Sequence, residues 1–131
     1  MSDRRRIFSA TELEGRYGYA RAVVVGDRVL VSGTAPIWPD GSCDPDPGVQ
    51  AARCCEIIAK ALADAGSSPS EVVRTRMFVT DASYAEAVGT VHAEFFGSEP
   101  PATAMIVVSG LIDERWKVEI EAEAVAAKPS T

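Results

Sequence analysis

The sequence predicts an α+β domain in which six strands form one sheet and two helices cover a single face of it. Three observations predict this class. Trp116–Ala126 alternates apolar and acidic residues with period two, which indicates a strand with one covered face. Gly26-Asp27 separates two β-branched runs, which favours a two-residue hairpin. Val49–Ala65 and the segment from Ser83 to Phe96 have the apolar spacing of helices with one buried stripe.

Length and composition favour a single soluble domain over residues 1–131. The 131 residues can bury about two-thirds of the unfolded surface, and 47% hydrophobic residues are typical of an ordinary core. No apolar run approaches the roughly 20 residues of a membrane-spanning helix. The N-terminal MSDRRRIFSA lacks the apolar segment of a secretory signal. We therefore expect no membrane partner.

Charge and cysteine content exclude two further classes. The net charge of −6 repels phosphate backbones, so no nucleic-acid partner is expected. The chain has an odd number of cysteines, Cys43, Cys54 and Cys55, and they lack the spacing of metal ligands. This pattern supports neither a disulfide framework nor a zinc site. Reduced thiols in the cytoplasm fit this pattern best.

The first third of the chain is predicted to be mostly extended. Arg5–Ser9 forms a short opening strand, and Ala22–Val25 and Arg28–Ser32 form the hairpin. Glycine at the first turn position favours a type II′ turn. Ile37–Gly48 is rich in proline, glycine and aspartate and is predicted to be a loop.

The helix Val49–Ala65 is predicted to end at Gly66, which suits the C′ position. Cys55 belongs to its apolar stripe and is interpreted as a small buried hydrophobe, whereas Cys54 points away from the stripe. Nothing nearby marks Cys54 as an activated thiolate. The stripe consists of Ala51, Ala52, Cys55, Ile58, Ala59 and Leu62.

The next strand, Val72–Thr80, has two distinct faces. Alternation places Arg74, Arg76 and Phe78 on one face. The opposite face carries Val73, Thr75, Met77 and Val79.

A second helix follows, and two strands complete the chain. Ser83–Glu86 matches a capping box that opens a helix running to Phe96. Its only histidine, His92, borders the apolar stripe and is predicted to be a packed edge residue rather than a base. Its stripe is predicted to consist of Tyr84, Ala87, Val88, Val91 and Phe95. Ala102–Val108 and Trp116–Ala126 are the last two predicted strands.

Glu119, Glu121 and Glu123 share one face of the last strand, with neighbours about 6–7 Å apart. Two interpretations stay open, a solvated sheet face or one glutamate lining a ligand cleft. Arg74 and Arg76 either clamp an anionic ligand or neutralise the glutamates across the sheet, and the second is favoured. Because some strands are apolar on both faces, a closed homo-oligomer is expected.

Several segments together resemble the RidA/YjgF family, also known as the liver perchloric-acid-soluble proteins. The resemblance covers a core of about residues 7–126 and depends on the order and spacing of the segments. The matching residues are Tyr19, Val31–Pro36, Gln50, Val72–Asp81, Phe95-Phe96, Pro101–Thr103 and Val118–Ala122.

This resemblance implies a chorismate-mutase-like fold with a mixed six-stranded sheet and two helices on one face. It further implies a homotrimer whose sheets form an inner barrel, with ligand clefts between subunits. The activity it implies is hydrolysis of enamines and imines such as 2-aminoacrylate to 2-keto acids and ammonia, without metal or cofactor.

Carried over residue by residue, the resemblance assigns Glu119 to positioning the water. Thr103 stands where the family has an arginine that clamps the substrate carboxylate, and a hydroxyl cannot make that bidentate pair. Arg21 and Arg76 are the candidate replacements. The predicted substrate-binding residues are Tyr19, Ser32, Gly33, Thr34, Thr103 and Met105, the last through its backbone.

Three functions remain in view. The first is a small-molecule enzyme of this type that binds a carboxylate-bearing metabolite and uses Glu119 as general base. The second, motivated by Thr103, is a non-catalytic metabolite-binding or chaperone-like homotrimer. The third, an endoribonuclease, comes from an old family label, and the acidic composition speaks against it.

Overall fold

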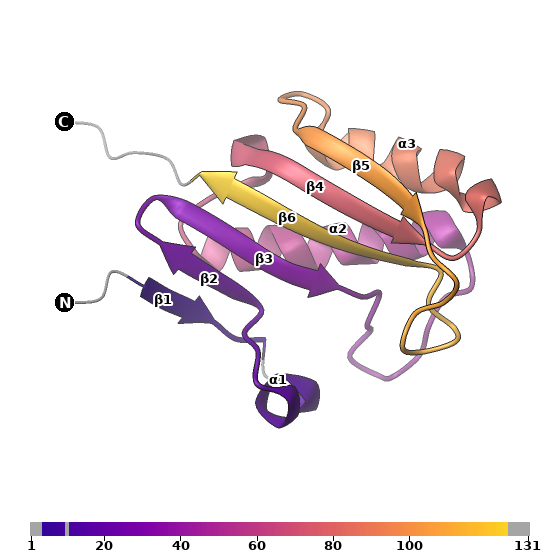
Figure 1. Ribbon diagram of the computed structural model, residues 1–131, viewed down its shortest axis with the longest axis horizontal. Coiled ribbons are helices and arrows are strands. Elements are labelled where there is room, and N and C mark those ends of the chain that lie inside the picture. The colour runs from indigo at the N-terminus through magenta and orange to yellow at the C-terminus, as the bar shows by residue number, and fades with distance from the viewer. Residues whose placement is uncertain (1–3, 10, 126–131) are drawn as a thin grey trace.

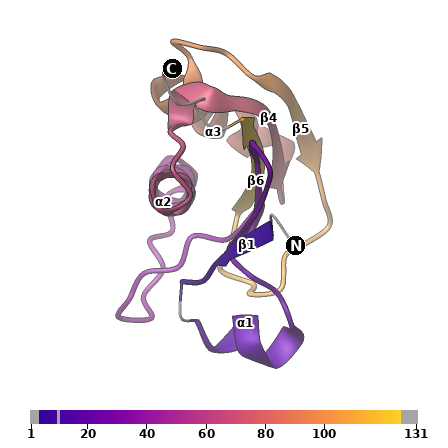
Figure 2. The ribbon, with the colours of Figure 1, turned by 90° about the vertical axis from the view of Figure 1, so that its left-hand side faces the viewer.

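The computed structural model describes residues 4–9 and 11–125 and has the predicted α+β architecture, with a mixed six-stranded sheet (Figure 1). Helices α2 (Pro47–Asp64) and α3 (Ala85–Phe96) pack on one face, and the short helix α1 (Glu12–Tyr17) lies beyond the lower edge of the sheet (Figure 2). The strands are β1 (Arg4–Ile7), β2 (Ala22–Val25), β3 (Arg28–Thr34), β4 (Val72–Val79), β5 (Ala102–Val107) and β6 (Val118–Val125).

The strand order is β1-β2-β3-β6-β4-β5, which places the C-terminal strand β6 inside the sheet. The pair β4–β5 is parallel and all other neighbours are antiparallel. Strand β6 alternates as predicted, with Val118 and Ile120 fully buried under the helices and the glutamates on the opposite face, here called the open face.

The predicted hairpin is confirmed, with four register pairs from Ala22↔Val31 to Val25↔Arg28. Gly26 has φ 59, which the first position of its turn requires and which a side chain would oppose. Strand β3 continues beyond the predicted end at Ser32 to Thr34. Its register against β6 shifts between Val31 and Thr34, which marks a bulge at Ser32-Gly33.

Helix α2 begins two residues earlier than predicted because Asp46 caps it, accepting from the amides of Gly48 and Val49 at 2.8 and 3.0 Å. The prediction for Cys54 was wrong, since its side chain is fully buried together with Cys55. Helix α2 packs against β3, β6 and α3 at once, so more than one stripe of it is covered. The three cysteines are free thiols.

Two predictions in the second half also need correction. Val73 is 50% exposed rather than facing the helices with Thr75, because the β4–β6 register shifts between Val72 and Arg74. Helix α3 is not opened by a capping box. Instead Asp81 accepts from the amide of Ser83 and caps a 3-10 turn, Ala82–Tyr84, that leads into α3.

Three further details differ from the prediction. Helix α1 was not predicted, and Ala87, expected on the buried stripe of α3, is exposed. The last strand begins at Val118 rather than Trp116. The predicted end of that strand, Ala126, lies outside the described residues. Within the described ranges, no helix combines the length and the apolar character that crossing a membrane requires.

The buried amide of Gln50 holds two loops and the start of β6 to helix α2. Its Nε2 donates to the carbonyl oxygens of Asp44 at 2.8 Å and Arg115 at 3.0 Å. Its Oε1 accepts from the amide of Lys117 at 2.8 Å. One side chain therefore fixes the strand entrance two residues before Glu119.

Candidate functional site

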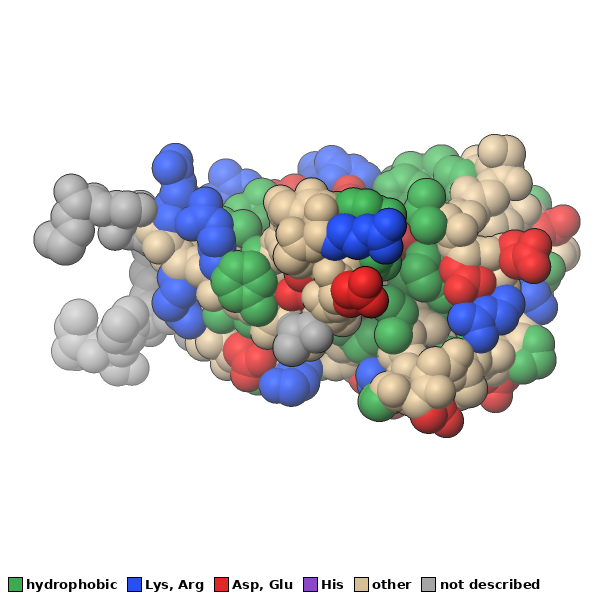
Figure 3. All heavy atoms as spheres, turned by 90° about the horizontal axis from the view of Figure 1, so that it is seen from below, with side chains coloured by type: hydrophobic (Ala, Val, Ile, Leu, Met, Phe, Trp, Pro, Cys, Tyr) green, Lys and Arg blue, Asp and Glu red, His purple; other side chains and the backbone are tan. Residues whose placement is uncertain are grey.

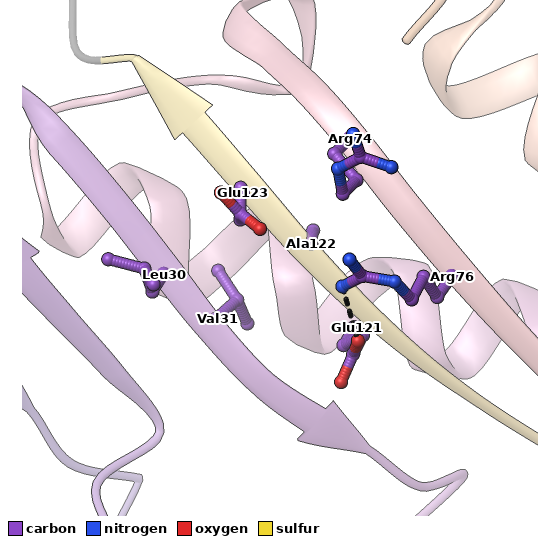
Figure 4. A pocket seen from close by; sticks show the side chains of 7 residues that line it. All are labelled: Leu30, Val31, Arg74, Arg76, Glu121, Ala122 and Glu123. Atoms are coloured by element: carbon purple, nitrogen blue, oxygen red, sulfur yellow. Dashed lines mark hydrogen bonds and ion pairs between the residues drawn. The ribbon is translucent and has the colours of Figure 1, made fainter. Parts of the chain in front are cut away.

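The three glutamates of β6 differ in how they are paired. Glu121 binds Arg76 at 2.8 Å, which agrees with the expected neutralisation across the sheet (Figure 4). Glu123 binds Arg28 at 2.9 Å rather than Arg74, so the prediction for Arg74 was wrong. The side chain of Glu119 makes neither a hydrogen bond nor an ion pair with any described residue. Burial raises its pKa, while Arg21 lowers it and Glu121 raises it to lesser extents. Of these three glutamates, Glu119 is therefore the one whose carboxylate is available to contact a ligand or a water molecule.

Arg21 lies directly before β2 and is only 5% exposed. Its Nη2 donates to the carbonyl oxygen of Gly33 at 2.7 Å, and its guanidinium lies 5.8 Å from the ring centroid of Tyr19. The Nε atom is buried without a hydrogen-bond partner in the described chain. A buried cation with one unused donor is costly unless something completes it.

Glycine at position 33 lets the Glu119 side chain approach the β3 bulge. A Cβ atom at this position would lie 2.6 Å from Oε2 of Glu119, closer than real contacts allow. The structure thus brings together Glu119, Arg21, Gly33 and Tyr19, four of the residues that sequence analysis named.

Ser32 and Thr34 flank this cluster, but their hydroxyls have internal partners. Ser32 Oγ donates to the carbonyl oxygen of Ala20 at 2.7 Å, and Thr34 Oγ1 donates to that of Ser32 at 2.8 Å. Thr34 is fully buried. Both side chains therefore shape the end of β3 rather than offering a free donor.

Thr103 and Met105 lie elsewhere in the same chain. They pair in register with Thr75 and Met77 of β4, so their side chains point to the helix-covered face, opposite Glu119. A single chain therefore does not bring them to the glutamate. The other candidate clamp, Arg76, is held by Glu121.

Glu14 is a site residue that sequence analysis missed. It is 3% exposed and accepts hydrogen bonds from Ser9 N at 3.0 Å, Thr11 Oγ1 at 2.8 Å and the Ser9 hydroxyl. These bonds, with a smaller contribution from Arg21, outweigh burial and lower its pKa. Arg21 thus interacts electrostatically with two carboxylates, those of Glu14 and Glu119. The signal was present in the sequence, because Thr11 and Glu14 have capping-box spacing at the start of α1.

Two cavities among the described residues differ in their relation to this cluster. One of about 170 Å³ lies on the open face over β3, β6 and β4 and is lined by none of the cluster's four residues; Figure 4 shows Arg76 and Glu121, joined by their ion pair, in its wall. The second, of about 340 Å³, lies between the β1 end and α2, and Arg21 forms part of its wall. Its lining comprises Ile7, Phe8, Ser9, Thr11, Arg21, Ile37, Pro39, Arg53, Glu56, Ile57, Lys60, Ala61 and Asp64.

Charge on the underside of the molecule is mixed. Figure 3 shows basic and acidic side chains interspersed with hydrophobic ones on this face. Among residues 4–9 and 11–125, no group of three or more His, Cys, Asp or Glu side chains is arranged to hold a metal ion.

Comparison with known proteins agrees with this architecture. Residues 9–126 match the family model described as endoribonuclease L-PSP. An uncharacterized protein of Streptomyces coelicolor is 38% identical over 92% of this chain and 90% of its own length. The crystal structure of Rv2704 from Mycobacterium tuberculosis, a member of the YjgF/YER057c/UK114 family, has a TM-score of 0.87 and 40% identity, covering 95% of this chain and 100% of that one.

A further similar structure contains a ligand. The crystal structure of Escherichia coli TdcF with bound serine has a TM-score of 0.80 and 27% identity. The match covers 93% of this chain and 94% of that one.

Proposed function

This chain belongs to the RidA/YjgF family, whose model carries the description endoribonuclease L-PSP, and from this premise we propose a metal-free enzyme that hydrolyses 2-imino or 2-enamino acids. Its substrate is a small carboxylate-bearing metabolite bound in a cleft between copies of the chain. The observation that supports this most is the unpaired, half-buried Glu119 beside the buried cation Arg21.

Glu119 acts as general base in this proposal. Burial raises its pKa toward the range where a carboxylate accepts a proton from water more readily. Water attacks the C2 atom of the C=N bond while Glu119 takes one of its protons. Glu119 passes that proton to the nitrogen, the new C2 hydroxyl gives its own proton to the nitrogen as well, and the C2–N bond breaks to release ammonia and leave the carbonyl of a 2-keto acid. A 2-enamino acid enters the same step after it takes a proton at C3 and loses one from nitrogen to become the imine. Water is the only co-reactant required.

Arg21 is the group proposed to receive the substrate carboxylate in place of the family arginine. Its Nε is buried without a partner, and Nη2 is already directed by the Gly33 carbonyl oxygen. A charge-assisted hydrogen bond to an incoming carboxylate would use guanidinium donors that the Gly33 carbonyl oxygen leaves free. Serine bound to TdcF supports a ligand of amino-acid size.

A homotrimer is part of the proposal because one chain leaves its site open. Leu30 and Ile106 on the open face are 41% and 38% exposed, although both are large and apolar. Strand β5 pairs only with β4, so it borders one edge of the sheet. A neighbouring copy set against the open face would cover these residues and bring its own β5, with Thr103 and Met105, toward Glu119.

The test measures how fast the protein consumes freshly generated 2-iminopropionate and how fast it releases ammonia. The mass of the same protein in solution is measured to give its oligomeric state. Glu119→Gln should lower the rate by about 10²–10⁴-fold, the usual contribution of a general base. The matched control is Glu123→Gln, which changes a carboxylate already paired with Arg28 on the same strand. Full activity of Glu119→Gln, or a monomeric wild-type protein, would exclude the proposed mechanism.

A second candidate follows from Thr103. A trimer that binds 2-amino or 2-keto acids without turning them over would show saturable binding that Arg21→Met weakens, yet no ammonia release.

Endoribonuclease activity is the least supported of the three functions, since the net charge of −6 disfavours contact with a polyphosphate chain.

A further inference from the structure

A separate polar cluster connects helix α3 to the edge strand β5. Thr75 Oγ1 lies 2.8 Å from His92 Nε2 and 2.5 Å from Thr103 Oγ1, and His92 Nε2 lies 3.5 Å from Thr103 Oγ1. Thr75 is fully buried, His92 is half-buried against Phe96 and Thr103 is exposed. The three side chains thus form one hydrogen-bonded path from the protein interior to the surface.

The directions of these hydrogen bonds depend on one another. Each hydroxyl has a single proton to donate. If His92 Nε2 carries a lone pair, Thr75 must donate to it, and Thr75 then has no proton left for Thr103. Thr103 must in turn donate to Thr75, so only its lone pairs remain for any group outside. If Nε2 is protonated, it donates to Thr75, and Thr75 in turn donates to Thr103. The Thr103 proton is then free to point outward.

Burial lowers the pKa of His92, so the ring is neutral at neutral pH and one of its two nitrogens carries a lone pair. The Thr75 hydroxyl, 2.8 Å from Nε2, favours the arrangement in which that lone pair is on Nε2. A neutral imidazole nitrogen is also a stronger acceptor than a hydroxyl oxygen. Both O–H groups near Nε2 therefore gain most by donating toward the ring.

We propose that His92 is a positioning residue which, through Thr75, keeps the Thr103 proton turned inward, so that Thr103 offers an acceptor to the ligand. The ligand group that it takes is an N–H donor, such as the amino or imino nitrogen of a 2-amino or 2-imino acid, rather than a carboxylate. This inference rests on the proposed function, in which β5 of one copy borders the cleft of the next.

The relay is tested first without any ligand. Because His92 is the only histidine, long-range proton–nitrogen NMR of the imidazole reports its tautomer without ambiguity. A bare Nε2 and protonated Nδ1 are expected at neutral pH, and Thr75→Val should change this tautomer balance. A protonated Nε2 in the wild-type protein at neutral pH overturns the inference.

The ligand preference is tested by calorimetry with alanine and pyruvate, which differ in their N–H groups. Thr103→Val and His92→Phe should weaken alanine binding about tenfold, as expected for one lost hydrogen bond, and leave pyruvate unchanged. Thr103→Ser and His92→Gln should retain alanine binding, because serine keeps the hydroxyl group and the glutamine Oε1 replaces Nε2 as the acceptor for Thr75. Equal losses for both ligands overturn the inference.

The two proposals fail in distinguishable ways. If wild-type protein binds neither alanine nor pyruvate, the proposed function fails, and the predicted ligand preference fails with it. If both bind and Thr103→Val changes neither affinity, only the role of Thr103 fails.

Discussion

Glu119 and Gly33 face each other across the β3–β6 pair so closely that a methyl group on Gly33 would lie 2.6 Å from Oε2 of Glu119. The β3 bulge and the carboxylate therefore fit only because residue 33 has no side chain. Arg21 is held at the same bulge by the Gly33 carbonyl oxygen. The backbone at Gly33 thus sets the positions of both charged groups of the candidate site.

Gly33→Ala is expected to displace the Glu119 carboxylate while leaving the fold intact, since the clashing atom is the end of a flexible side chain. Activity should fall at least tenfold, because catalytic geometry tolerates displacements of about 1 Å poorly. Imino-acid turnover and a thermal melt measure the two effects. Gly15→Ala is the control, since nothing lies within 4 Å of its added methyl. Unchanged turnover in Gly33→Ala would contradict a role for the carboxylate position.

Arg21→Met should destabilise the protein by about 1–3 kcal/mol, because it removes the hydrogen bond to the Gly33 carbonyl and a cation that interacts favourably with two carboxylates. It should also raise the pKa of Glu119 further, as the opposite charge is lost. Urea unfolding at fixed protein concentration and carbon NMR of the Glu119 carboxyl measure these changes. Arg21→Lys keeps the positive charge, so the pKa of Glu119 in this variant should stay below its value in Arg21→Met.

Gln50→Ala should cost about 2–4 kcal/mol, since three backbone groups lose a buried amide partner together. The loss should be visible locally as faster hydrogen exchange of the Lys117 amide. Exchange as slow as in the wild-type protein would mean that water replaces the side chain without cost. Gln50→Glu, which keeps an acceptor for that amide, should protect it partly.

Gly89→Ala in the middle of α3 should raise stability by about 0.5–1 kcal/mol, the usual difference between these residues in a helix. The added methyl would lie 3.8 Å from Cε of Met105, an ordinary contact. Thermal unfolding checks this. A decrease would show that the backbone of α3 or the packing of Met105 needs the glycine.

The fold could be predicted because its strongest signals are local. The alternation of Val118–Val125 and the Gly26-Asp27 turn each depend on residues that are neighbours in the chain. The errors have non-local causes. Cys54 is buried because α2 packs on β6, where its Sγ lies 4.0 Å from the carbonyl oxygen of Val118. Whether Val73 faces the helices depends on a register shift against β6.

The candidate site could be predicted only in part. Glu119 was identified from its strand and from the family resemblance, but its distinction from Glu121 and Glu123 required the ion pairs that occupy those two. The contacts of Arg21 depend on residues that come from other parts of the chain, Gly33 at the bulge of β3 and Glu14 in α1. No spacing in the sequence indicates that Thr75, His92 and Thr103 meet, because they come from three separate elements.

The pH dependence of stability should report the burial of Glu119. Burial is the largest effect on its pKa, which it raises above the ordinary value of 4.5, so the native state holds this proton more tightly than the unfolded chain does. Between the unfolded and folded pKa values the native state binds more protons. The contribution of Glu119 to the free energy of unfolding must therefore fall as pH rises through that window.

Glu119→Gln removes this contribution, so the variant should be more stable than the wild-type protein above the window and lose less stability across it. Other carboxyl groups titrate in both proteins, and the difference between the two curves isolates residue 119. Urea unfolding from pH 4 to pH 8 at one protein concentration measures it. Glu123→Gln is the matched control on the same strand. Parallel curves for wild type and Glu119→Gln would mean that the carboxylate is hydrated in the native state, and a hydrated carboxylate would not have the raised pKa on which its role as general base depends.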